Sequence, residues 1–154
     1  MWSSLEEVVR TVVEGVKRRH PYARVSVHYM NFARHALIAV EHGDTVRRIY
    51  VVFVRAPFYR FCDYFPRWCE EHGRDHALTL NWEVMVRLSD IGITRVYYFL
   101  EDGRVYMVPL KLFYDLKLCR YQKKERATRV CHVPLKMARL VADYSKGIPL
   151  DIYT

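Results

Sequence analysis

Apolar residues recur with a helical period near the start of the chain. They follow the capping sequence Ser4-Leu5-Glu6-Glu7 at intervals of three and four residues: Leu5, Val8, Val9, Val12, Val13 and Val16. The pattern predicts an amphipathic helix. We expect this helix to end at His20, because the residue before Pro21 is disfavoured in the helical region.

Three segments that follow have the pattern of strands. Residues 22–30 alternate between apolar and polar side chains, which predicts a strand with one solvated face. Residues 36–41 and 46–54 predict a hairpin around residues 42–45. Residues 49–54 are apolar on both faces, so we expect them to form the central strand of a sheet.

A second hairpin is predicted at residues 94–110. Asp102-Gly103 favours a type I′ turn, which would place Phe99 opposite Tyr106. One face would then carry Val96, Tyr98, Leu100, Val105 and Met107, and the other Arg95, Tyr97, Phe99, Arg104, Tyr106 and Val108. The second set combines aromatic rings with arginines, which suits base stacking and phosphate binding. The alternative interpretation is a second buried face.

Further helices complete the predicted fold. Asn81 is expected to cap a helix at residues 82–91 that ends at Gly92. Residues 111–121 fit both a helix and a strand, and Pro109 favours the helix. Residues 135–144 predict a last helix. Together these elements predict an α+β fold in a single domain, 1–154, with an antiparallel sheet of about five strands built from two hairpins and helices packed mainly on one face.

Residues 58–69 form the densest aromatic segment of the chain. Pro57 and Pro66 suit the first turns of two short helical segments. The segment is interpreted either as a helix packed on the sheet or as an aromatic wall whose Tyr59, Arg60 and Trp68 are available for stacking.

Cysteine and histidine residues raise the question of a metal site. Cys69, His72 and His76, with Cys62 as a fourth ligand, have a spacing compatible with zinc, but the paired C-x-x-C motifs of zinc ribbons and fingers are absent. We therefore expect ordinary helix side chains and no metal or other cofactor. Cys119 and Cys131 can pair with each other or with Cys62 and Cys69, and the sequence does not give the connectivity.

Composition restricts the class of protein. With 51% hydrophobic and 27% charged residues the chain should fold. No apolar run is long enough to span a membrane and the first residues do not resemble a secretory signal, so we expect a cytoplasmic protein with no membrane partner. Side-chain amides occur only at Asn31, Asn81 and Gln122, which points to a hyperthermophile, where intracellular disulfides do occur.

The net charge of +8 lies in one stretch of the chain. Residues 104–146 hold 11 Lys and Arg against Asp115, Glu125 and Asp143, whereas the rest of the chain holds 14 basic and 14 acidic residues. This segregation favours a polyanionic partner. Its densest part is the run Lys117, Arg120, Lys123, Lys124, Arg126 and Arg129. A solvated helix end is the alternative interpretation.

These features predict binding of single-stranded nucleic acid, DNA in the first place, with little sequence preference and no catalysis. The predicted binding residues are Arg95, Tyr97, Phe99, Arg104, Tyr106, Lys117, Arg120, Lys123, Lys124, Arg126 and Arg129, with Tyr59, Arg60 and Trp68 as a stacking wall. One alternative is a viral or host protein-interaction module, since Tyr and Arg are also common in protein interfaces.

A nuclease is the other alternative. Asp102 and Asp115-Leu116-Lys117 resemble the acid and the D-x-K of metal-dependent nucleases of the restriction-endonuclease type. This chemistry requires Asp115 and Lys117 on one face of a strand, with Asp102 pointing toward them.

Size, basicity, aromatic content and thermophile composition make the chain similar to the ThermoDBP family, the single-stranded DNA-binding proteins of some hyperthermophilic archaea. The likeness concerns the whole chain and carries over no binding residue. It implies DNA protection in replication and repair, by a homodimer. The family's long C-terminal dimerisation helix has only a short counterpart here, at residues 135–144.

Overall fold

The computed structural model describes residues 1–30, 34–123 and 127–151. They form two compact units, each assembled from segments that are distant in sequence. Unit 1 comprises Met1–Arg55, Arg95–Met107 and Leu140–Thr154, and unit 2 comprises Ala56–Thr94 and Val108–Arg139. Helices and strands occur in both, which confirms the α+β class. The organisation as a single domain stays a prediction.

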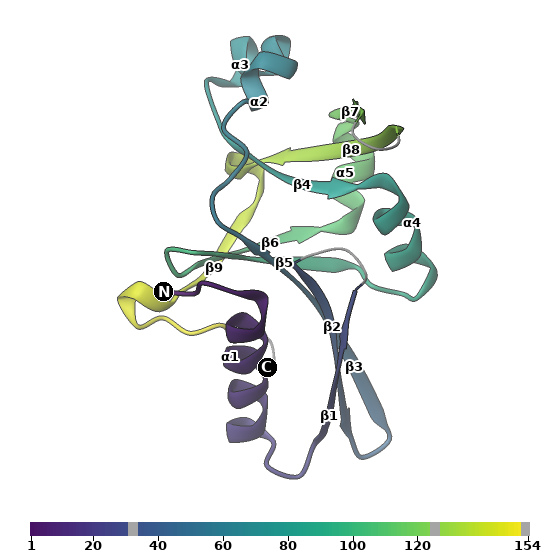
Figure 1. The fold of residues 1–154 in the computed structure, drawn as a ribbon, viewed down its shortest axis with the longest axis vertical. Coiled ribbons are helices and arrows are strands. Elements are labelled where there is room, and N and C mark those ends of the chain that lie inside the picture. Colours follow the sequence, from purple (N-terminus) through teal and green to yellow (C-terminus); the bar gives the residue numbers. More distant parts are fainter. Residues whose placement is uncertain (31–33, 124–126, 152–154) are drawn as a thin grey trace. The chain divides into compact units, whose positions relative to one another are not determined.

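Unit 1 is built on a mixed sheet of six strands in the order β1-β2-β3-β5-β6-β9 (Figure 1). Its elements are α1 (Leu5–Arg19), β1 (Arg24–Tyr29), β2 (His35–His42), β3 (Thr45–Val54), β5 (Arg95–Leu100), β6 (Arg104–Pro109), β9 (Arg139–Asp143) and the 3₁₀ helix η2 (Tyr144–Lys146). The predicted hairpin of β2 and β3 is confirmed, and β3 is an inner strand. The prediction of a purely antiparallel sheet is wrong, because β3 pairs with β5 in parallel. Residues 55–94 separate these two strands, a connection long enough for parallel pairing.

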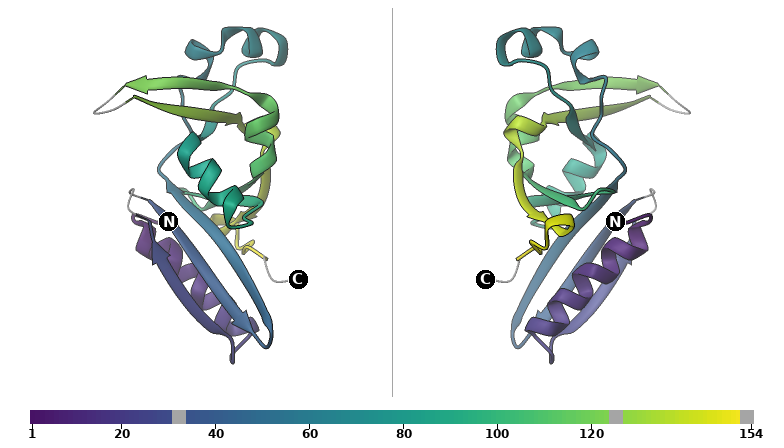
Figure 2. Two further views of the ribbon diagram at one scale, coloured as in Figure 1. Left: turned by 90° about the vertical axis from the view of Figure 1, so that its right-hand side faces the viewer. Right: turned by 90° about the vertical axis from the view of Figure 1, so that its left-hand side faces the viewer.

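The predicted N-terminal helix is confirmed as α1. Ser4 caps it by accepting a hydrogen bond from the backbone N–H of Glu7 at 3.3 Å, and its C-cap is His20. The apolar stripe of α1 is buried in one core cluster with side chains of β2 and β3, among them Ile38 and Val51. Figure 2 shows α1 lying along one face of β1, β2 and β3.

The turn between β5 and β6 differs from the predicted type I′ turn. A type I′ turn needs positive φ at both central residues, but among the described non-glycine residues only Arg34 and Lys117 have positive φ, so Asp102 does not. Gly103 has a φ of 103° and donates its backbone N–H to the Leu100 carbonyl at 3.0 Å. The loop therefore holds three residues, 101–103, instead of two.

This longer loop overturns the predicted open face. One extra loop residue reverses the face that each β6 side chain takes, so Val105 and Met107 pack with Tyr97 and Phe99 in the unit 1 core. Tyr97 is 8% exposed and Phe99 is fully buried, so neither ring can stack on a base. Within the hairpin, Arg104 binds the Asp102 carboxylate at 2.9 Å and the Tyr106 hydroxyl at 3.1 Å.

Unit 2 contains an antiparallel sheet of three strands in the order β4-β8-β7. Its elements are α2 (Phe61–Tyr64), α3 (Pro66–His72), β4 (Ala77–Asn81), α4 (Trp82–Asp90), α5 (Leu110–Leu116), β7 (Cys119–Lys123), β8 (Ala127–Pro134) and the 3₁₀ helix η1 (Leu135–Met137). Two short helices do occur in the aromatic segment, and Pro66 opens α3 as predicted, but Pro57 lies outside α2, which begins at Phe61. The predicted helix after Asn81 is confirmed as α4, whose cap Asn81 accepts from the backbone N–H of Glu83 at 2.8 Å.

Two helix predictions fail near the C-terminus. The expected helix over residues 111–121 ends at Leu116, because Lys117 takes the left-handed conformation with a φ of 54°, and the chain continues as β7. The expected helix over residues 135–144 is replaced by η1 and β9. Pairing of β9 with the end of the unit 1 sheet supplies backbone partners that outweigh local helix propensity. Across the described ranges, no helix has the length and apolar character needed to cross a membrane.

The buried position of Phe99 leads to a test of stability. Phe99→Ala should lower the free energy of unfolding by about 3–5 kcal/mol, because it removes a fully buried ring that packs against Trp2. Urea unfolding followed by fluorescence measures this change. Tyr22→Ala, at a side chain that is 97% exposed, is the control and should stay within about 0.5 kcal/mol of the wild type. Unchanged stability of the Phe99 variant would contradict the buried position.

Candidate nucleic-acid interface

The β7–β8 pair of unit 2 has two faces with different chemistry. Tyr121 lies opposite Arg129 and Cys119 opposite Cys131, so these four residues share one face, here called the Arg129 face. Arg120 and His132 alternate to the other face, here called the Arg120 face. Figure 2 shows β7 and β8 extending together past α4 and α5.

On the Arg129 face, an arginine lies between two aromatic side chains. The Arg129 guanidinium lies 5.0 Å from the centre of the Trp82 ring and 5.6 Å from that of Tyr121, and it donates to the Tyr121 hydroxyl at 3.5 Å. Tyr114 contacts Trp82 edge to face at 5.2 Å. Tyr121 is 71% exposed, so much of its surface is open to a ligand.

These side chains line a pocket of about 590 Å³. Its lining consists of Trp82, Phe113, Tyr114, Lys117, Cys119, Arg120, Tyr121 and Arg129. The described lining thus combines cations with aromatic rings and includes no carboxylate. Such a pocket suits a ligand that has both a flat ring and negative charge.

Local sequence signals position the walls of this pocket. The cap at Asn81 starts α4 at Trp82, so the indole follows directly after strand β4. The left-handed Lys117 ends α5 and returns the chain into β7. A disulfide between Cys119 and Cys131 then joins β7 to β8 at directly opposed positions. A cross-link of this kind restricts the unfolded chain and so stabilises the pair.

On the Arg120 face, a second arginine is held by a buried histidine. Arg120 donates its Nε–H to Nε2 of His132 at 3.1 Å, and its guanidinium lies 4.2 Å from the Tyr64 ring centre and 5.0 Å from that of Phe58. His132 is fully buried, and Phe58 stacks on it with the ring centres 5.3 Å apart. Burial, and then the charge of Arg120, lower the pKa of His132 to about 4, so the imidazole is neutral at pH 7.

Arg120 and Arg129 differ from several other cations of the chain in their partners. Arg19, Arg55, Arg60, Arg104 and Lys111 each form an ion pair with a carboxylate. Over the described residues, neither Arg120 nor Arg129 has such a pair, and both contact aromatic rings instead. Their positive charge is therefore not neutralised by a neighbouring carboxylate in that part of the chain.

The predicted stacking wall is partly open. Tyr59 is 71% exposed, whereas Trp68 packs on Phe61 and stacks on His72 with ring centres 4.4 Å apart. Arg60 is paired with Asp63 at 3.3 Å. Phe61 is buried, so the segment forms a small core and also exposes rings at its surface. The role of Tyr59, Arg60 and Trp68 as a stacking wall stays a prediction.

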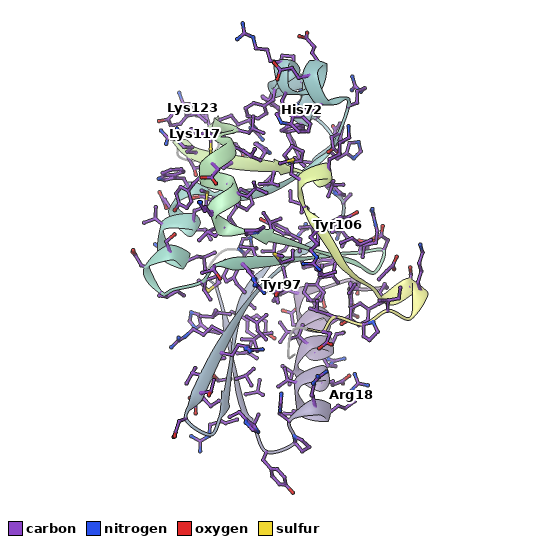
Figure 3. The ribbon with its side chains drawn as sticks, turned by 180° about the vertical axis from the view of Figure 1, so that it is seen from behind. Arg18, His72, Tyr97, Tyr106, Lys117 and Lys123 are labelled. Carbon is purple, nitrogen blue, oxygen red and sulfur yellow. A yellow bond between two sulfur atoms is a disulfide. The ribbon has the colours of Figure 1, made fainter. Side chains whose placement is uncertain are left out.

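The structure brings together part of the predicted binding set. Lys117, Arg120 and Arg129 line one pocket, and Lys123 lies on β7, exposed, on the same face as Tyr121 (Figure 3). Arg95, Tyr97, Phe99, Arg104 and Tyr106 belong to unit 1 and line no part of this pocket. Lys124 and Arg126 lie outside the described residues.

Sequence reasoning missed the aromatic partners of these cations. Trp82 directly follows the Asn81 cap, and Tyr121 lies inside the basic run, so both had a local signal. Tyr64 and His132 carried none, because only the tertiary fold brings them to Arg120. Tyr114 carried none either, since it reaches the site through its contact with Trp82.

The cysteines and acidic residues that suggested metal chemistry have other partners. Cys62 and Cys69 are joined by a disulfide between α2 and α3, and the described ranges hold no group of His, Cys, Asp and Glu arranged for a metal ion. Asp115 lies on helix α5, where it pairs with Lys111 at 3.9 Å. Asp115 and Lys117 therefore do not share a strand face.

No protein-family model, curated protein or solved structure matches the chain. The similarity to the ThermoDBP family stays a prediction from the sequence.

The buried His132 makes stability depend on pH. Its pKa is about 4 when folded and about 6.5 when unfolded, so the unfolded chain binds more protons between these values. The contribution of the neutral, buried imidazole to the free energy of unfolding is present in full above pH 6.5. It is lost as pH falls through 4, and the loss amounts to about 3 kcal/mol. Urea unfolding of the wild type at several pH values should show this loss.

His132→Leu is the matched variant for the pH experiment. It should lose about 3 kcal/mol less than the wild type between pH 7 and pH 3.5, because it has no imidazole to protonate at this position. Equal slopes for both proteins would contradict a buried neutral His132. His35, whose pKa burial also lowers to about 4, remains in both and cancels in the comparison.

Proposed function

We propose that the protein binds single-stranded nucleic acid, DNA in the first place, with little sequence preference and without catalysis. The observation that carries this proposal is the Arg129 site, where an arginine without a described carboxylate partner lies against Trp82 and an exposed Tyr121. The pocket around it supplies a further cation in Lys117. We assign base stacking to Tyr121 on the β7–β8 pair, instead of to the aromatic residues of the β5–β6 hairpin.

The two kinds of side chain have separate roles in this proposal. Cations neutralise backbone phosphates and release counterions, so affinity should fall steeply with salt and depend little on sequence. Tyr121 offers a ring on which a base can stack, at about 1–3 kcal/mol per base. Duplex DNA keeps its base faces stacked inside the helix, so the aromatic contribution is available only to single strands. Preference for single strands over duplex is therefore the distinguishing property.

The cellular setting is part of the proposal. We place the protein in the cytoplasm of a hyperthermophilic archaeon, acting as a homodimer that protects exposed DNA. The scarcity of side-chain amides and the whole-chain resemblance to the ThermoDBP family support this setting. Two disulfides are compatible with it, since intracellular disulfides are frequent in hyperthermophiles.

Fluorescence anisotropy with labelled single-stranded and duplex oligonucleotides tests the proposal. Tyr121→Ala should weaken single-strand binding by about 1–3 kcal/mol and leave its salt dependence unchanged. Arg129→Gln should reduce the slope of log K against log salt by about 0.7, the value for one phosphate contact on a single strand. Neither residue is buried in the unit 2 core, so both variants should fold.

Matched controls come from unit 1. Tyr22→Ala and Arg48→Gln remove an exposed tyrosine and an exposed arginine, and both variants should bind like the wild type. Equal affinity of the wild type for duplex and single strand would refute base stacking. The absence of binding at low salt would refute the proposal as a whole and favour a protein-interaction role, and cleavage of the oligonucleotide with Mg²⁺ would favour a nuclease.

A further inference from the structure

We propose that Arg120 forms a second phosphate-binding site, on the opposite face of the unit 2 sheet from Arg129, and that His132 is the residue that positions it. The inference rests on the proposed function: one nucleic-acid strand would contact the Arg129 face, cross the edge of β7 and place a further phosphate on Arg120. The contacts made by Arg120, the edge position of β7 and the state of His132 each support it.

The position of β7 makes such a crossing feasible. The sheet order β4-β8-β7 leaves β7 as an edge strand. The pocket is lined by the consecutive residues Cys119, Arg120 and Tyr121. Cys119 and Tyr121 belong to the Arg129 face, whereas the side chain of Arg120 points to the opposite face. A nucleic-acid strand that follows the Arg129 face and crosses the edge of β7 would therefore reach Arg120.

Arg120 is fixed before any ligand arrives. Its Nε–H is donated to His132, and its guanidinium packs against Tyr64 and Phe58. An arginine that uses Nε in this way keeps four N–H groups on its terminal nitrogens, which can hold two phosphate oxygens at once. A side chain that is already ordered loses little conformational entropy on binding, which favours affinity.

His132 can hold Arg120 only in its neutral form. Because Nε2 accepts the hydrogen bond, the proton of the neutral ring is on Nδ1. Nδ1 is buried and has no hydrogen-bond partner in the described part of the chain. A buried donor without a partner lowers stability. A histidine at this position is therefore better explained by its other ring nitrogen, Nε2, which accepts the hydrogen bond from Arg120. A leucine of similar size would avoid that unpaired donor but would leave Arg120 without an acceptor.

Arg120 is the charged group that faces the imidazole. Arg120 lies on β7, and Thr79 lies opposite His132 on β4. Three rings also pack against His132: Phe58 before α2, Phe61 in α2 and Phe65 between α2 and α3. The titratable Tyr64 reaches the site through its contact with Arg120. Protonation of His132 would replace the acceptor by a second donor and place two positive charges side by side, so Arg120 would be displaced.

The test compares labelled oligo(dT) of about 4 and about 16 nucleotides, the range of site sizes of single-strand-binding folds. For the longer oligonucleotide, Arg120→Gln should weaken binding about tenfold and lower the salt slope by about 0.7. The shorter one, which can be held on the Arg129 face alone, should be affected by less than about twofold. Arg48→Gln is the matched control, because this exposed arginine belongs to unit 1 and lines no part of the pocket, and it should bind both like the wild type.

His132 variants test the positioning role. His132→Leu should reproduce the effect of Arg120→Gln on the longer oligonucleotide, and His132→Gln should restore most of the affinity, because its amide oxygen can accept the Nε–H. In the wild type, binding of the longer oligonucleotide should weaken as pH falls through about 4, where the pKa of His132 lies. His132→Gln should lack this loss, and thymine does not gain a proton in that range. Histidine NMR should show the Nδ1–H tautomer at pH 7.

Each outcome points to one conclusion. Wild-type affinity of Arg120→Gln for the longer oligonucleotide would overturn the second site, and equal weakening for both lengths would overturn the crossing of the β7 edge. Wild-type binding by His132→Leu would overturn the positioning role, and if this variant does not fold, the tautomer and the pH profile decide instead. Absence of wild-type binding to either length would refute the proposed function, whereas binding that depends on Tyr121 and Arg129 alone would refute only this inference.

Discussion

The register of β7 against β8 is the constraint on which the candidate interface depends. Because Cys119 faces Cys131, Tyr121 must face Arg129, and Arg120 must point to the side where His132 lies. The Cys119–Cys131 disulfide holds this register by a covalent bond. A shift of one residue would exchange the faces and separate each arginine from its aromatic partners. The disulfide thus helps to maintain both the fold of unit 2 and the chemistry of its surface.

Arg120 and Arg129 differ in their partners from the cations that form ion pairs in the described residues. Five ion pairs neutralise cations elsewhere in the described residues, all of them near the surface, where such pairs contribute little to stability. Arg120 and Arg129 are held instead by rings and by neutral acceptors. Packing against aromatic faces orders a guanidinium without cancelling its charge, so the field of each arginine stays available to an anion.

A single turn shows how a small local difference changes a functional interpretation. The Asp102-Gly103 sequence suits a two-residue turn, yet the loop takes three residues and Gly103 alone supplies the positive φ. Tyr97 and Phe99 then share a core with Val105, α1 and Trp2. Tyr97 and Phe99, which looked suited to base stacking, contribute to stability instead. Tyr121 lies on a strand that the sequence pattern did not predict, and its ring is exposed beside Arg129.

The sequence alone determined the α+β class, the capped helices α1 and α4, the β2–β3 hairpin and the basic character of residues 104–146, because each depends on local periodicity, caps or composition. It also placed Lys117, Arg120 and Arg129 among the binding candidates. The parallel pairing of β3 with β5, the strands β7, β8 and β9, the disulfide pairing and the two arginine sites were decided only by the tertiary structure. The parallel pairing joins residues far apart in the chain, whereas the disulfides span only 7 and 12 residues. Neither kind of contact leaves a periodic signal in the segments that make it, so neither could be predicted from the pattern of the chain.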